Sequence, residues 1–584
     1  MLYFIAIWIG LFAVCLTVGC GWLHWLQAGR IDRAGDRAAA ALWLGLVILA
    51  ISVLAVAIFA PLSPLAGIVA AAPWLLLALK SPAVRTELSQ WASKLSYGLL
   101  VMYGLCSVVI AAVISQKVTW LDTGQYHYGL IRWFAEYGVT PGLVLLNPQF
   151  GFVSAWFALT APFDVAAFEG RVGPVLNGFI LLVAALQIAI ALSRIARSRA
   201  RLSDWFSLIF LSAVCLLLVR TPLLAVITRS PSPDSAIALL TVAVAWSMLV
   251  VGAAADSNDS RKMIGGDLIP LVLSAGAVSI KLTALPLLPG AAGFYLCRGV
   301  CQNVSLRGYL KRLAIANLLT LLLLLPFLAA EILVSGCPLY PATIACLDLP
   351  WTESAAATQN LAESTHGWGR WFGRPPSEAN QTLWLIRQWF TNNPSNRLIV
   401  GLIVASACSM IQLLALFLTR KLRDQFYSLF WLTMMAVAGT TFMMLKAPLF
   451  RFGMSCVLLL PILSISILCN AWAQQKWGSL LTKYLLRPLK RLEYSLLSVG
   501  VFWVIALSSP AYDGLGSRLL TPPLLPTVDL EIQQFNQINY VVSQDKRKQC
   551  WSADLPCVGS IRSDVKLRNP QAGLRGGFIL KDVP

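Results

Sequence analysis

Hydrophobic residues fill the chain in long runs that are separated by short polar loops. The runs are about 18 to 22 residues long, which is the length that an α-helix needs to cross the hydrocarbon core of a bilayer. The pattern therefore predicts an all-α polytopic integral membrane protein. No basic segment precedes the first run, so we expect a first span there and not a cleaved signal peptide. We place about 14 transmembrane helices at 3–25, 40–60, 64–79, 97–114, 174–193, 205–219, 235–254, 268–280, 283–297, 313–334, 398–418, 427–445, 453–473 and 494–510.

Clustered Lys and Arg residues set the orientation of these spans. Short loops rich in such residues are typical of the cytoplasmic side of a membrane protein. Loops of this kind follow the first, third, fifth, ninth, eleventh and thirteenth predicted spans, so they all fall on one side if both termini lie on the other. We therefore expect a multi-pass protein of the bacterial inner (cytoplasmic) membrane, with both termini in the periplasm.

The orientation divides the chain into three parts. Residues 1–96 are expected to form N-terminal extra transmembrane helices, and residues 97–510 the transmembrane core. Residues 511–584 are expected to form a small exterior C-terminal tail. Two long exterior loops, 115–173 and 336–397, interrupt the core.

Two stretches depart from a simple alternation of spans and loops. Residues 151–169 are apolar, but counting them as a span would reverse every later loop, so we expect an interfacial or re-entrant helix along the membrane. The spans on either side of Lys281 are short and contain Pro and Gly. Segments of that kind are tolerated at membrane depth where they line a cavity.

The composition agrees with a membrane protein. The chain has 584 residues, of which 58% are hydrophobic and 12% are charged, about half of the charged fraction of a soluble domain. The net charge of +19 invites a nucleic-acid partner, but the basic residues lie mainly in short loops, where membrane orientation accounts for them. We therefore expect the lipid bilayer as a partner and no nucleic acid.

Four of the 13 cysteines lie in predicted exterior segments, namely Cys337, Cys346, Cys550 and Cys557. An even number of cysteines in an oxidising compartment indicates two disulfides. The spacings favour the pairs Cys337–Cys346 and Cys550–Cys557. No histidine is near either pair in the sequence, which makes a zinc site the weaker alternative. His24 lies inside the first predicted span, where we expect a packed side chain.

The densest polar chemistry follows directly on the fourth predicted span, in the stretch TWLDTGQYHYGLIRWFAEYGVTPGL. Asp122 lies at its start, at the mouth of the predicted bundle, where a partly desolvated carboxylate suits a general base or a metal ligand. Tyr126 and His127 follow on the same segment, with Tyr126 as a substrate-binding candidate and His127 as a further catalytic candidate. If the segment is a helix along the membrane surface, Arg132 shares one face with other polar residues, where it could bind substrate. The aromatic residues also fit the interfacial belt of a membrane protein.

A second polar set lies in the short exterior loops, where the orientation rule predicts few cations. Asp234 is predicted to lie near several of them, and an ionisable residue at membrane depth is a functional candidate. A lipid phosphate or pyrophosphate is an obvious partner for such cations, while headgroup contacts and pairing with Asp234 are the alternative. The candidate phosphate-binding cations are Arg220, Arg229, Lys281, Lys446 and Arg451.

Two resemblances follow from these segments. From the fourth to the fourteenth span, the chain resembles the C-type (GT-C) glycosyltransferases. These enzymes also have many spans and an acidic residue at the start of the first long exterior loop. The chain also resembles a little-characterised family of bacterial multi-spanning membrane proteins that is regarded as GT-C-like. The segments that carry this second resemblance are DTGQYHYGLIRWFAEYGVTPGL, SPSPDSAIALL, KLTALPLL, CPLYPATI, FRFG and QCWSADLPC.

The resemblance implies a glycosyltransferase that moves a sugar from a polyprenyl-phosphate-type donor to a glycan or lipid acceptor. The reaction would take place at the periplasmic face, in cell-surface glycan synthesis. Asp122 would be the catalytic base and Asp234 a second acid. Many GT-C enzymes carry paired acids at the start of the loop, whereas Asp122 stands alone, so the sequence leaves a divalent metal cofactor open.

Two other functions fit parts of the sequence. An O-antigen polymerase or ligase would use a long late exterior loop with Arg and His, which His366 and Arg370 could provide. A lipid-linked sugar transporter or flippase would use the broken spans around Lys281.

Overall fold

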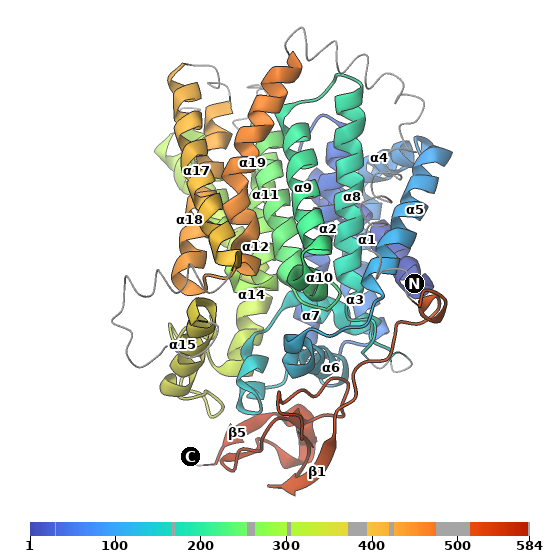
Figure 1. Ribbon diagram of the computed structural model, residues 1–584, viewed down its shortest axis with the longest axis vertical. Coiled ribbons are helices and arrows are strands. Elements are labelled where there is room, and N and C mark those ends of the chain that lie inside the picture. Colours follow the sequence, from blue (N-terminus) through green and yellow to red (C-terminus); the bar gives the residue numbers. More distant parts are fainter. Residues whose placement is uncertain are drawn as a thin grey trace.

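The computed structural model describes residues 1–29, 31–165, 168, 170–253, 263–300, 305–371, 394–419, 425–474 and 514–581. Within these residues, ten helices are long and apolar enough to cross a membrane. They run side by side along the long axis of the molecule (Figure 1). The ten are α1 (Leu2–Trp25), α2 (Ala34–Ala57), α5 (Tyr97–Ile114), α8 (Val175–Ala196), α9 (Leu202–Arg220), α11 (Asp234–Gly252), α14 (Leu306–Ser335), α17 (Pro394–Leu418), α18 (Phe426–Lys446) and α19 (Phe450–Gln474).

These ten helices correspond to ten of the predicted spans, and the chain is a multi-pass helical membrane protein. Three further predicted spans correspond to shorter helices, α3 (Pro64–Lys80), α12 (Ile269–Ile280) and α13 (Leu287–Val300). Helix α3 turns by 93° into α4 (Pro82–Ser93), because Ser81 is extended and Pro82 opens a new helix. The last predicted span, 494–510, lies outside the described residues, so the count of 14 stays a prediction.

Helices α2 and α11 form the centre of the bundle. Of the most apolar 18 residues of each helix, 94% are buried in α11, compared with 11% in the peripheral α17. Small residues bring α1 and α2 into backbone contact. A Cβ added at Gly19 would lie 1.7 Å from the carbonyl oxygen of Ala41, and one added at Gly45 would lie 1.9 Å from that of Cys15. Close approach at glycine is a common way for membrane helices to pack.

The first exterior loop is folded against the bundle. It contains a π-helical turn, η1 (Thr123–His127), then α6 (Tyr128–Glu136) and α7 (Ala155–Thr160). The interfacial helix expected at 151–169 is replaced by the six-residue α7, all of whose residues are buried. Ser154 accounts for its start, because its Oγ accepts from Trp156 N and donates to the Ile280 carbonyl at 2.7 Å. The segment is therefore apolar because it packs on α2, and not because it lies along lipid.

The second exterior loop begins after α14, where Gly336 takes a left-handed conformation (φ 79°) and ends the helix. The disulfide Cys337–Cys346 follows, which confirms the first predicted pairing. Helix α15 (Ala355–Trp371) carries His366. The side chain of Arg370 and residues 372–393, on which the polymerase or ligase alternative depends, lie outside what the structure describes.

The C-terminal tail is a small β structure, so the all-α prediction is wrong for this part. Strands β1 (Leu530–Phe535) and β2 (Ile538–Ser543) pair antiparallel, with Leu530 opposite Ser543, and the two-residue turn between them has positive φ at both positions. Such a turn matches the twist of a hairpin. The remaining strands are β3 (Cys557–Val558), parallel to β2, and the antiparallel pair β4 (Val565–Leu567) and β5 (Phe578–Leu580). Figure 1 shows these strands at one end of the helical bundle, beside α6.

Candidate functional site

Four charged residues from distant parts of the chain meet at the end of the bundle that carries the C-terminal strands. Asp122 immediately precedes η1, Asp234 opens α11, Lys281 follows α12, and Arg451 lies in the first turn of α19. The Nη1 atom of Arg451 lies 3.1 Å from Asp122 Oδ2 and 3.6 Å from Asp234 Oδ2. The Nζ atom of Lys281 pairs with Asp234 Oδ1. We call these four residues the charged cluster.

Local structure explains how two members of the charged cluster are placed. Asp234 is the first residue of α11, where the helix dipole favours a carboxylate. Lys281 is extended (φ −161°, ψ 131°) and separates α12 from the turn that leads to α13. Because the helix is interrupted at Lys281, its ammonium group lies where a continuous apolar helix would otherwise run.

Aromatic rings support the two cations of the cluster. The guanidinium of Arg451 lies 5.0 Å from the ring centroid of Trp120 and 4.5 Å from that of Phe452. Lys281 Nζ lies 4.4 Å from the Phe452 centroid. Cation–π contacts of this length are attractive, most of all when water is excluded. The sequence marks Trp120 and Phe452 only by their places, two positions before Asp122 and directly after Arg451.

The charged cluster is balanced in formal charge, and each of its cations is close to a carboxylate. It holds two carboxylates and two cations, and Arg451 lies between the carboxylates. Asp234 is buried, and its Oδ2 atom makes no hydrogen bond within the described residues, although Arg451 is close. A divalent cation that bridged both carboxylates would have to displace Arg451. In this arrangement the position between the two acids is taken by the guanidinium of Arg451.

Tyr126 and His127 lie behind the charged cluster and are packed by neighbouring rings. The His127 ring is 4.4 Å from that of Tyr126 and 5.1 Å from that of Phe157, and Thr123 Oγ1 is 3.2 Å from His127 Nδ1. Burial lowers the pKa of His127 to about 3, so the imidazole is neutral at neutral pH. Burial and the nearby Asp122 charge hold the pKa of Tyr126 well above its ordinary value. Neither group is poised to exchange a proton near pH 7.

Arg132, which the sequence predicts as a substrate-binding residue, does not make the ion pairs of the charged cluster. Its guanidinium donates to the backbone carbonyl of Ser552 at 2.6 Å and to that of Ala553. It also pairs with Glu136 at 2.8 Å on the next turn of α6. Through these contacts, Arg132 holds the C-terminal tail against α6.

The tail also contacts the backbone directly after Asp122. The carbonyl oxygen of Gly124 accepts hydrogen bonds from Cys550 N (2.7 Å) and Trp551 N (3.1 Å). Gln549 donates to the Leu121 carbonyl, and the disulfide Cys550–Cys557, the second predicted pair, closes this loop of the tail. The tail thus holds the segment that carries Asp122 in place.

The other three predicted cations lie apart from the ion pairs of the charged cluster. Arg220 is the last residue of α9 and Lys446 the last residue of α18, and both are exposed. Arg229 follows α10 (Pro222–Thr228) and is partly buried. Burial and the neighbouring charge of Arg518 lower its pKa. Of the five predicted cations, the described ion pairs bring Lys281 and Arg451 to Asp234.

One comparison with known proteins gives a match. The model of a family described as a domain of unknown function (DUF8201) matches residues 1–458. That range includes all four residues of the charged cluster and ends within α19, before the C-terminal strands. No curated protein and no solved structure matches the chain.

Proposed function

The chain belongs to the DUF8201 family, which is described as a domain of unknown function, and we propose that it is a glycosyltransferase of the GT-C type. It moves a sugar from a polyprenyl-phosphate-type donor to a glycan or lipid acceptor at the periplasmic face of the inner membrane. The observation that carries the proposal is the charged cluster, in which Arg451 joins Asp122 to Asp234 beside Lys281. The cluster lies at the end of an apolar bundle, where a lipid-linked anion and a water-soluble acceptor can meet.

Asp122 is the general base of this reaction. Its side chain is about one-fifth exposed, in contrast to the buried Asp234, so an acceptor hydroxyl has access to it. Asp122 takes the hydroxyl proton while the acceptor oxygen attacks the anomeric carbon of the donor sugar. The bond from that carbon to the phosphate oxygen breaks, and the electron pair leaves with the phosphate.

Lys281 and Arg451 stabilise the negative charge that gathers on the leaving phosphate. Positioned cations that meet developing charge commonly supply the largest catalytic contribution. Both cations are close to carboxylates, so a bound phosphate shares them with Asp234. Asp234 keeps the two cations in place and does not exchange a proton.

Replacement of Asp122 tests the proposal. Asp122→Asn keeps the shape of the side chain and removes the base, so it should abolish sugar transfer to acceptor while the yield and melting temperature of the purified protein stay close to those of the wild type. Asp348→Asn is the matched control, because Asp348 is an exposed carboxylate on the second exterior loop. Full transfer by the Asp122→Asn variant would contradict the proposal.

Transport of a lipid-linked sugar is the second candidate, and the break at Lys281 favours it. Discontinuous helices that bring charged groups to membrane depth are typical of transporter binding sites. Reconstitution in liposomes separates the two functions. A donor that crosses the bilayer without formation of a glycosidic bond would favour transport, whereas product formation without net crossing supports transfer.

A further inference from the structure

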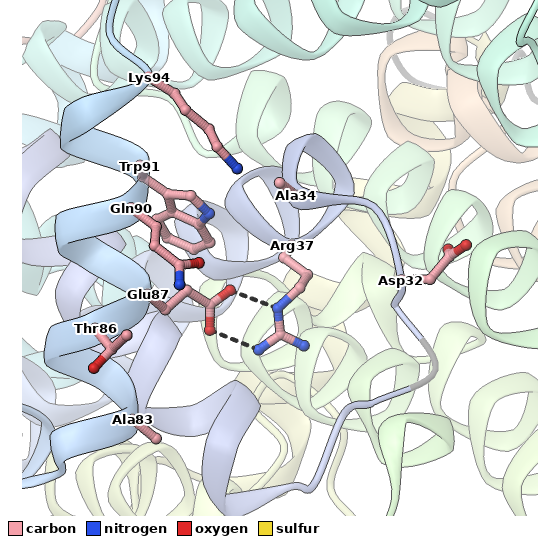
Figure 2. Close-up of a pocket in the computed structure, with 9 residues that line it drawn as sticks. All are labelled: Asp32, Ala34, Arg37, Ala83, Thr86, Glu87, Gln90, Trp91 and Lys94. Carbon is pink, nitrogen blue, oxygen red and sulfur yellow. Dashed lines mark hydrogen bonds and ion pairs between the residues drawn. The ribbon is translucent and has the colours of Figure 1, made fainter.

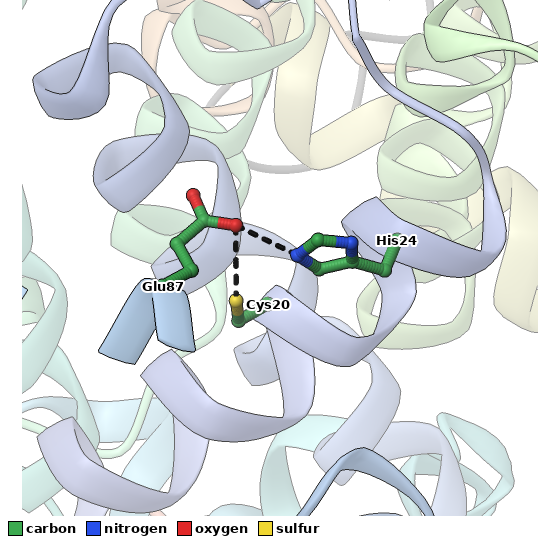
Figure 3. Close-up of side chains that lie close together, drawn as sticks. All are labelled: Cys20, His24 and Glu87. Atoms are coloured by element: carbon green, nitrogen blue, oxygen red, sulfur yellow. Dashed lines mark hydrogen bonds and ion pairs between the residues drawn. The ribbon is translucent and has the colours of Figure 1, made fainter. Parts of the chain in front are cut away.

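Three metal-ligating side chains meet at the other end of the bundle, away from the charged cluster. Cys20 and His24 are one turn apart on α1, so they share a face of that helix. Glu87 approaches them from α4, as Figure 3 shows. Helix α4 lies far from the C-terminal strands (Figure 1).

The distances fit a small tetrahedral metal ion. Glu87 Oε2 is 2.8 Å from His24 Nε2 and 3.6 Å from Cys20 Sγ, and all three ligand atoms lie within 4.8 Å of one another. A tetrahedral zinc ion with ordinary bond lengths places its nitrogen and oxygen ligands about 3.4 Å apart and its sulfur and oxygen ligands about 3.6 Å apart. The sulfur–oxygen distance already matches, and the nitrogen–oxygen distance has to open by about half an ångström.

Arg37 on α2 fixes the carboxylate of Glu87. It donates from Nε to Oε1 at 2.5 Å and from Nη2 to Oε2 at 2.8 Å, as Figure 2 shows. It also donates to the Ala28 carbonyl at 3.0 Å, which anchors the guanidinium. Metal-ligating carboxylates are commonly held by such outer hydrogen bonds. The same contacts would exist in a simple ion-pair network, which a metal titration distinguishes from a metal site.

One of the three side chains, that of Glu87, also borders a cavity. The cavity has a volume of about 480 Å³ and is lined by Glu87, Arg37, Trp91 and Lys94 among others (Figure 2). Cys20 and His24 do not line it. The Cys20 side chain is buried and that of His24 is 29% exposed, so an ion would reach the group past Glu87 or His24.

We propose that Cys20, His24 and Glu87 bind a zinc ion that ties α4 to α1. A thiolate, an imidazole and a carboxylate are together a donor set that zinc accepts, and three protein ligands leave one position for water. On binding, the Cys20 thiol releases its proton to solvent, and His24 binds as a neutral imidazole. The proposal does not depend on the function of the charged cluster.

Titration of the full chain with Co²⁺ and Zn²⁺ tests this site. The protein is purified in detergent, stripped of metal and titrated with Co²⁺, whose thiolate complexes absorb in the near ultraviolet. We expect one Co²⁺ per chain with a thiolate band, and displacement of that ion by Zn²⁺. Cys20→Ser should remove the band, and His24→Ala should weaken Zn²⁺ binding by at least about 10-fold, since even outer-shell changes at metal sites cost that much.

Cys15→Ser is the matched control, because Cys15 is a second buried cysteine on α1 and lies outside the metal-ligating group. It should leave the thiolate band and the affinity unchanged. Thermal unfolding gives a second measurement, in which Zn²⁺ should raise the melting temperature of the wild type and of Cys15→Ser but not that of Cys20→Ser. A titration without a thiolate band, or a band that survives in Cys20→Ser, would overturn the proposal and leave an ion-pair network.

Discussion

Arg451 Nη1 donates to Asp122 Oδ2 across 3.1 Å and joins two residues that are 329 positions apart in the chain. The contact connects the start of α19 to the segment that follows α5. The same nitrogen lies 3.6 Å from Asp234 Oδ2, so one guanidinium links three separate segments. The charged cluster is therefore a product of the whole fold, and a change at any one of its members should affect the others.

Arg451→Lys should lower sugar transfer by about 100-fold or more, as is typical for loss of one positioned donor at a developing charge. Lysine keeps the charge but lacks the planar guanidinium, whose Nη1 atom reaches both carboxylates while the group lies over Trp120 and Phe452. The measurement is the rate of transfer at saturating donor. Lys446→Ala is the control, because Lys446 ends α18 on an exposed surface, and its rate should stay close to that of the wild type. An equal loss in both variants would mean that general surface charge, and not the Arg451 geometry, matters.

The pairing of Asp234 with Lys281 predicts strong coupling in a double-mutant cycle. Asp234→Asn leaves Lys281 without its carboxylate and should cost about 3–5 kcal/mol of unfolding free energy, as loss of one partner of a buried ion pair does. Adding Lys281→Met removes the uncompensated charge, so the double variant should recover a large part of that loss. Reversible unfolding of the detergent-solubilised protein measures the four variants of the cycle.

The exposed ion pair between Arg201 and Asp32 provides the comparison for that cycle. Its two side chains are 46% and 53% exposed, and its nearest nitrogen and oxygen are 2.7 Å apart. The coupling energy of such a pair is typically below about 1 kcal/mol. Equal coupling in the two cycles would show that the Asp234 pair is solvated and is not held in a low-dielectric site.

Docking of the C-terminal tail should be sensitive to the replacement of one hydrogen atom of Gly124 by a methyl group. A Cβ at this position would lie 2.7 Å from Trp551 Cε2 and 2.8 Å from Gln549 Nε2, so Gly124→Ala should push the tail away from the segment that carries Asp122. Limited proteolysis should then cut the tail faster, and transfer should fall with it. Gly104→Ala serves as the control, because nothing lies within 4 Å of the position of its added Cβ. An unchanged cleavage rate in Gly124→Ala would mean that the tail adjusts without loss of docking.

The sequence predicted the members of the charged cluster because a charge within apolar segments is conspicuous. Asp122, Asp234, Lys281 and Arg451 each interrupt or border a hydrophobic run, and the structure brings all four together. The predicted disulfides were also confirmed, since their cysteines stand apart from the spans and close to each other.

Other features could not be predicted, because they depend on partners that carry no sequence signal. Arg132 contacts the backbone carbonyls of Ser552 and Ala553, and no sequence signal marks these partners because every residue has a carbonyl. The strands of the tail are short, and all six β1 residues are exposed, so β1 has no buried face that an alternating pattern could mark. Hydropathy also predicts a span at α3, α12 and α13, whose composition is apolar, whereas each of these helices is shorter than 18 residues.

The two disulfides predict a defined pattern of cysteine labelling. Alkylation of the unfolded chain without a reductant should leave four cysteines unmodified, and labelling after reduction should add four alkyl groups. Mass spectrometry of the peptides should assign these four to Cys337, Cys346, Cys550 and Cys557. Four groups gained at any other positions, or none gained, would contradict both the pairing and the oxidising location that was inferred from it.

The carboxyl group of Asp164 predicts how stability changes with pH. Burial raises its pKa from 3.8 to about 6, although the Gly170 N–H donates to it at 2.9 Å, and the charges of Arg132 and Glu136 act on it in opposite directions. Because the folded state holds the proton more tightly than the unfolded state, the favourable contribution is complete below pH 4 and is lost as the pH rises through 6. A shift of about two pKa units corresponds to at most about 3 kcal/mol. Asp164→Asn removes this titration, so the fall in melting temperature between pH 4 and pH 7 should be smaller in the variant than in the wild type. Parallel curves for the two proteins would place Asp164 in contact with solvent.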